Sequence, residues 1–153
     1  MNHLRRALIT VLLAPGITLA QGEAKHARYE EALRFSNDWL DQFVAGNSDA
    51  TFDLLAPTFQ RNLTREVWRK EVEKERADLG KQTSRTLRRI VWYQDPANAP
   101  LPGLYAAVEY DSVFENSDLH FQYLMLHSQD NLPFRVMRRE VILVRKKARR
   151  DEE

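Results

Sequence analysis

The chain has 153 residues, of which 43% are hydrophobic and 29% are charged, so its composition is that of an ordinary soluble domain and its length predicts a single domain. Its 23 Lys and Arg residues against 22 Asp and Glu residues leave a formal net charge of +1, which argues against a nucleic-acid-binding protein. It has no cysteine, so disulfide bonds, a thiol nucleophile, a thiolate zinc site and a lipid-modified N-terminal cysteine are excluded.

The first twenty residues have the order of parts that is typical of a secretory signal peptide. A short start with two arginines precedes a mostly apolar segment over residues 7–19, and Thr18 and Ala20 place small side chains before Gln21. The apolar segment is shorter than the about 20 residues that span a membrane, so we expect no stable membrane insertion. We therefore predict a signal peptide over residues 1–20, cleavage between Ala20 and Gln21, and a periplasmic or secreted protein. The alternative is an uncleaved amphipathic anchor or a disordered tail.

The first part of the mature chain has the periodicity of amphipathic helices. Between residues 27 and 45 the apolar side chains recur at steps of three and four: Tyr29, Leu33, Phe35, Trp39, Leu40, Phe43 and Val44. Gly46 follows in the position where a glycine commonly ends a helix. We expect a second, short helix that Pro57 ends, and a third helix over residues 64–79 with Thr64 as its cap.

After residue 80 the apolar period changes to two, which is typical of strands. Four segments rich in β-branched and aromatic residues are separated by short polar or proline-containing connections: residues 86–93, 104–114, 119–127 and 134–145. Short connections favour antiparallel hairpins. Helices followed by strands predict an α+β domain over residues 21–145, with the helices covering one face of an antiparallel sheet of about four strands. We expect residues 146–153 to form a charged, solvated tail rather than an attachment to an anionic surface.

A set of residues along the mature chain resembles a family of small exported bacterial proteins that is known only as domain of unknown function 4019. The matching residues occur in the order of the family: Trp68, Arg76, Leu79-Gly80, Ser84-Arg85, Pro102-Gly103-Leu104-Tyr105 and Tyr110-Asp111-Ser112-Val113-Phe114. The resemblance extends over residues 35–144. It implies a fold like that of nuclear transport factor two and the cystatin-like group, in which three helices lie against a strongly curved sheet and form a cone. The chain departs from the family pattern at Gln122, at Phe134 and at Arg138-Arg139. The family has no assigned activity, so the resemblance implies none.

Arg76 occurs at the spacing of an apolar helix face, because Trp68, Val72 and Leu79 occupy the neighbouring turns of that face. A guanidinium that faces the sheet needs a carboxylate partner, since an unpaired buried charge is very costly. We therefore predict a structural ion pair between Arg76 and a strand carboxylate. The candidates are Glu109 and Asp111, with Glu140 as a third. The alternative is that Arg76 binds an anionic ligand.

The predicted strands also carry polar side chains that would line a pocket in such a cone. Strand alternation places Tyr105, Glu109 and Asp111 on one face of the second strand, and Arg138 and Glu140 on one face of the last strand. The predicted pocket set is Tyr105, Glu109, Gln122, Arg138 and Glu140. His120 and His127 have opposite parity on one strand, so they cannot bind one metal ion together. No motif for a nucleophile, metal or cofactor occurs, so no catalytic residue, metal or cofactor is predicted.

These observations favour a non-catalytic module of the bacterial envelope that binds a small apolar ligand or an envelope protein. The alternative is a cofactor-free isomerase, dehydratase or hydrolase that uses a carboxylate with a Tyr or His in the cone. A homodimer through the outer face of the sheet is a further hypothesis, with Val141 and Leu143 as candidates for its apolar contacts.

Overall fold

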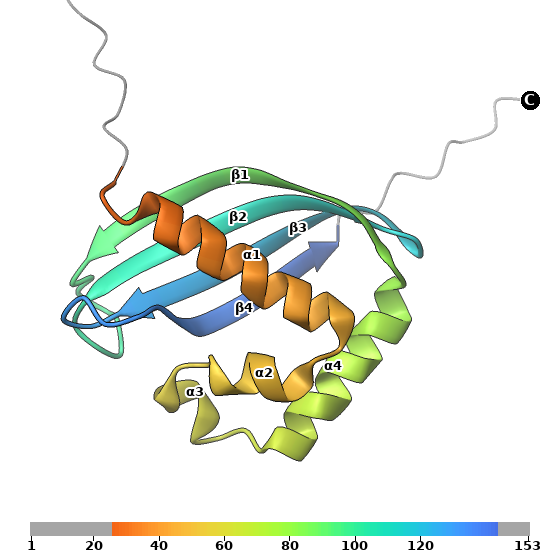
Figure 1. Cartoon of the computed structure of the whole chain (residues 1–153), viewed down its shortest axis with the longest axis horizontal. Coiled ribbons are helices and arrows are strands. Elements are labelled where there is room, and N and C mark those ends of the chain that lie inside the picture. Colours follow the sequence, from red (N-terminus) through yellow and green to blue (C-terminus); the bar gives the residue numbers. More distant parts are fainter. Residues whose placement is uncertain (1–25, 144–153) are drawn as a thin grey trace, which may run out of the picture.

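The computed structural model describes residues 26–143, apart from the side chains of residues 117–120 and 143. These residues form a helical layer and one antiparallel sheet with the strand order β1-β2-β3-β4 (Figure 1). The elements are α1 (Tyr29–Ala45), α2 (Ser48–Asp53), α3 (Pro57–Gln60), α4 (Arg65–Leu79), β1 (Gln82–Gln94), β2 (Leu104–Phe114), β3 (Ser117–Ser128) and β4 (Arg135–Leu143). The predicted α+β class and the antiparallel four-stranded sheet are therefore confirmed. The predicted signal peptide, its cleavage site at Ala20 and Gln21, and the charged tail lie outside the described residues.

The strands curve around α1, which crosses the concave face of the sheet (Figure 1). The buried side of α1 is the predicted amphipathic face and includes Trp39, Leu40 and Phe43. Gly46 ends the helix with a φ of 83°, a left-handed conformation that glycine adopts without strain. Its N–H donates to the carbonyl of Phe43 at 3.0 Å.

The short helices that follow α1 in sequence differ from the prediction at Pro57. Pro57 was expected to end the second helix, whereas α2 already ends at Asp53 and Pro57 begins the four-residue helix α3. Proline suits the first position of a helix because the N–H that it lacks would have no partner there. The segment between these helices is tied to the sheet, since Ala56 N–H donates to the carbonyl of Val136 at 2.8 Å.

The concave face of the sheet takes the even-numbered residues of β2 and β3. Ala106, Val108 and Tyr110 of β2 are almost completely buried beneath the helices. On β4 the parity changes, because Met125 pairs with Arg138 whereas Leu126 pairs with Val136. This bulge inserts Met137 and turns Arg139, the partner of Leu124, toward the helices. Arg138 and Glu140 therefore face the outer side.

The same register corrects the residues expected to form an apolar outer face. Val141 pairs with Gln122, so it lies on the concave side, and the side chain of Leu143 is not described. The large exposed apolar side chains of the outer face are those of Tyr93 and Ile142. Among residues 26–143, no helix combines the length and the apolar character that crossing a membrane requires.

Candidate functional site

The predicted ion pair of Arg76 is wrong. The exposed side chain of Arg76 donates through Nε to the carbonyl of Val44 at 2.8 Å, at the end of α1. Glu109 accepts two hydrogen bonds from Arg89, at 2.7 and 3.0 Å, and Asp111 accepts two from Arg88, at 3.3 and 2.8 Å. The reason is strand parity: odd-numbered residues of β2 point away from the helices, so neither carboxylate can reach α4.

The predicted pocket residues do not come together in one site. Tyr105 and Arg138 line a groove of about 480 Å³ on the outer side of the sheet, next to residues 96–100. The Tyr105 hydroxyl donates to the carbonyl of Leu101 at 2.8 Å, and burial raises the pKa of Tyr105. Glu140 is paired with Arg138, and Glu109 with Arg89. Only Gln122 of the predicted set lies on the concave side.

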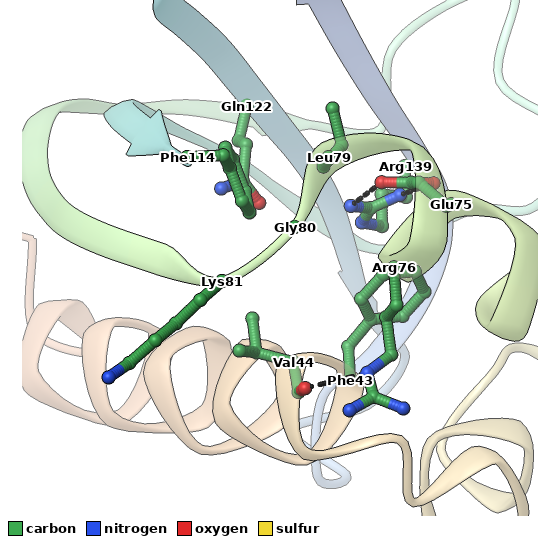
Figure 2. Close-up of a pocket in the computed structure, with 10 residues that line it drawn as sticks. All are labelled: Phe43, Val44, Glu75, Arg76, Leu79, Gly80, Lys81, Phe114, Gln122 and Arg139. Carbon is green, nitrogen blue, oxygen red and sulfur yellow. Dashed lines mark hydrogen bonds and ion pairs between the residues drawn. The ribbon is translucent and has the colours of Figure 1, made fainter. Parts of the chain in front are cut away.

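Gln122 lines a cavity of about 290 Å³ between the C-terminal ends of α1 and α4 and the sheet, which we call the α4 cavity. Figure 2 shows the side chains around it. Its walls come from three sources, namely the helices, the α4–β1 junction and three strands. The lining residues are Phe43, Val44, Glu75, Arg76, Leu79, Gly80, Lys81, Phe114, Gln122 and Arg139.

Arg139 is the most constrained side chain of the α4 cavity. Its two terminal nitrogens donate to the carboxylate of Glu75 at 2.7 and 2.5 Å, and its guanidinium lies 3.9 Å from the centre of the Phe43 ring (Figure 2). Only 11% of the side chain is exposed. Its Nε–H is buried and has no hydrogen-bond acceptor among the described residues. Such a donor is rare in a folded protein, so it calls for an acceptor from solvent or from a ligand.

The remaining lining combines apolar surface with positive charge. Phe43, Val44, Leu79 and Phe114 supply the apolar part. Arg76, Lys81 and Arg139 carry three positive charges against the single carboxylate of Glu75. Among the described residues, neither Arg76 nor Lys81 has a carboxylate within ion-pair distance.

Chemically, this arrangement is suited to binding. The side chain of Gln122 is almost fully buried and donates to the hydroxyl of Ser112 at 2.7 Å, so it is held in place. Glu75 is the one carboxylate among the lining residues, and both of its oxygens accept hydrogen bonds from Arg139. Within residues 26–143, no three His, Cys, Asp or Glu side chains lie close enough together to hold a metal ion.

Sequence reasoning missed Glu75 and Arg139, which define the cavity. The prediction selected Arg138 because it has the same parity as the buried Val136, and the bulge at Met137 reverses that parity. No Gly or Pro marks the bulge, so the sequence contains no signal from which it could have been predicted. Arg76 was predicted to face the sheet, whereas its side chain is exposed, and the neighbouring Glu75 is the α4 residue that pairs with the sheet through Arg139.

Comparison with known proteins gives a family but no relative of known activity. The profile of the protein family of unknown function DUF4019 matches residues 35–138. A search of curated proteins and a search of solved structures each found no match. The matched segment runs from α1 to β4 and includes every lining residue of the α4 cavity except Arg139, which directly follows it. Because this match extends over most of the chain, the protein belongs to the DUF4019 family.

Proposed function

We propose that this protein is a non-catalytic binding module that holds a small ligand in the α4 cavity. The observation that carries the proposal is the buried Nε–H of Arg139, which has no acceptor among the described residues and lies on a side chain that lines a preformed cavity with an apolar wall. Ligand sites are typically concave, mostly apolar and equipped with a few fixed polar groups. The volume of about 290 Å³ lies at the lower end of the range for such sites, so the ligand is small.

The alternative of a cofactor-free isomerase, dehydratase or hydrolase has less support. It requires a carboxylate and a Tyr or His within hydrogen-bond reach of one bound substrate. The described lining of the α4 cavity offers Glu75, which Arg139 already holds through both oxygens, and includes neither residue type. His127 and Tyr105 are engaged elsewhere, with the carbonyls of Pro102 and Leu101.

We also propose that the protein acts in the periplasm or outside the cell, on the strength of the signal-peptide pattern of residues 1–20. The curvature of the sheet around α1 supports a cone-type fold like that of nuclear transport factor two (Figure 1). An envelope protein as a partner and a homodimer through the outer face stay predictions.

A filled cavity tests the proposed function. In Val44→Phe, a ring takes the place of a half-buried side chain that borders the cavity, so we expect the affinity for 1-octanol to fall about tenfold or more. Binding is measured by two-dimensional NMR titration of the purified protein. Val67→Phe is the matched control, because Val67 is 47% exposed on α4 and outside the cavity. Equal binding by the two variants, or no binding of 1-octanol and related probes by the wild type, would refute the proposal.

A further inference from the structure

We infer that the ligand of the α4 cavity is a small carboxylate with an apolar body, and that its carboxylate binds the Nε edge of Arg139. This inference rests on the proposed function and adds the chemical class of the ligand. The argument uses the geometry of the guanidinium, the charges around the cavity and the nature of its walls.

A guanidinium presents its donors on more than one edge, and Glu75 uses the edge formed by the two terminal nitrogens of Arg139. The edge that contains Nε is left without a protein acceptor among the described residues. A carboxylate is the planar group that matches two parallel N–H donors, and its hydrogen bonds to a guanidinium are short and strong. Glu75 and the ring of Phe43 hold the guanidinium in place, so a ligand does not have to order it.

The local charges favour an anion as well. With Glu75 counted, the lining has an excess of two positive charges, and one bound carboxylate lowers this excess to one. The carbonyl oxygens at the end of α1 do not oppose an anion strongly, because those of Phe43 and Val44 already accept hydrogen bonds from Gly46 and Arg76. A second negative charge on the ligand is disfavoured, since it would lie beside Glu75 while the ammonium of Lys81 is directed away from Arg139 (Figure 2).

The walls beside Arg139 favour an apolar body. The rings of Phe43 and Phe114 and the side chain of Leu79 border the same cavity. Burial of a hydrocarbon chain against them supplies affinity that does not depend on charge. The carboxylate then adds orientation and selectivity, because it offers two charged acceptor oxygens, whereas the hydroxyl of a neutral analogue offers one uncharged oxygen.

The experiment compares octanoate, 1-octanol and octylammonium, which share one chain and differ in the charge of the head group. We expect octanoate to bind the wild type about tenfold more tightly than 1-octanol, and octylammonium to bind more weakly than 1-octanol. In NMR spectra of the arginine side chains, the Nε–H signal of Arg139 is expected to shift with octanoate and to shift much less with 1-octanol.

Two variants identify the group responsible. Arg139→Lys keeps the positive charge and removes the Nε–H, so we expect the preference for octanoate to disappear while 1-octanol binds as before. Arg138→Lys is the matched control, since it makes the same change one residue away on the outer face and is expected to keep the preference. Should Arg139→Lys fail to fold, the shift of the Nε–H signal in the wild type decides the question by itself.

The outcomes separate the two proposals. Equal affinity for octanoate and 1-octanol overturns the inference and leaves the proposed function intact. A preference for octanoate that persists in Arg139→Lys, or that leaves the Arg139 signal unmoved in the wild type, also overturns it, because the anion then binds elsewhere. Failure of all three probes to bind refutes the proposed function and the inference with it.

Discussion

Tyr110 shows how the concave face accommodates polar groups outside the α4 cavity. Its ring is 1% exposed, and its hydroxyl lies 2.6 Å from the hydroxyl of Ser36 on α1, which donates to the carbonyl of Leu33. Burial raises the pKa of Tyr110, because the phenolate would lose its hydration within the core. Either hydroxyl can donate in this hydrogen bond between helix and sheet, so it is the burial of the ring that opposes ionisation.

The raised pKa of Tyr110 predicts that the protein loses stability at alkaline pH. The folded pKa of Tyr110 lies above the unfolded value of about 10, so the contribution of the neutral phenol is fully present below that value and is lost as the pH rises through the folded pKa. We expect the free energy of unfolding to decline as the pH rises above about 10 and the decline to be shallower in Tyr110→Phe. Urea titrations at several pH values measure it, with the exposed Tyr93→Phe as control. An unchanged slope in Tyr110→Phe would contradict this account.

Among the elements, α4 is the one whose end position matters most for the candidate site, because it carries Glu75 and Arg76. It is also the one helix of the described segment whose N-cap side chain makes a capping hydrogen bond: the hydroxyl of Thr64 accepts from the N–H of Val67 at 3.2 Å. The opposite end is closed by Gly80, with a φ of 72°. Cap and glycine together define where α4 begins and where β1 starts.

Removal of the cap is expected to weaken α4. Thr64→Ala leaves an N–H at the first turn without its side-chain acceptor, so we predict a loss of about 1 kcal/mol in the free energy of unfolding. Thr64→Ser keeps the hydroxyl and serves as the control, with a stability near that of the wild type. Chemical denaturation followed by circular dichroism measures both. If the serine and alanine variants lose stability equally, the hydroxyl is not the stabilising group.

Elements were more predictable from this sequence than the site. The steps of three and four in α1 and the glycine after it indicated the helix and its end, and the change of period after residue 80 indicated the strands. Periodicity extends over many residues, so it tolerates local irregularity. The site depends on which face of the sheet single residues occupy. One bulge at Met137 places Arg139, instead of Arg138, on the concave face. Parity alone would have placed Glu109 and Asp111 on the outer face, given the mostly apolar even-numbered residues of β2.

At the scale of the whole molecule, the two faces of the sheet are chemically different. The concave face is covered by helices, whereas the outer face carries the ion pairs Arg88–Asp111, Arg89–Glu109 and Arg138–Glu140. Arg88–Asp111 and Arg138–Glu140 are largely exposed and contribute little stability individually, whereas the carboxylate of Glu109 is buried beneath the exposed Arg89. The candidate binding site therefore lies at the edge of the covered side and not on the open face.

Export is a prediction about the whole chain as well. If residues 1–20 are a signal peptide, the protein recovered from the periplasm of a Gram-negative host has an intact mass that begins at Gln21. Ala20→Tyr places a bulky side chain at the cleavage position, and we expect it to block processing. Gly22→Ala is the control, expected to be cleaved normally. Intact-mass spectrometry checks all three proteins, and a periplasmic wild type that retains residues 1–20 would exclude cleavage at this site.

The strand order β1-β2-β3-β4 also has a consequence for the way the chain folds. Every strand pairs with its neighbour in sequence, so the sheet can grow by successive hairpins at low loop-closure cost. The helices precede the sheet in the chain, and although Trp39 of α1 contacts Trp68 of α4, the rest of their apolar surface is covered only once the sheet exists. The bridge between Leu55 and Val136 joins the helical segment to the final strand, so it cannot form until β4 has been made. During synthesis the helices therefore leave the ribosome before the sheet that stabilises them has formed. Their stable packing depends on strands β1 to β4, which are made last.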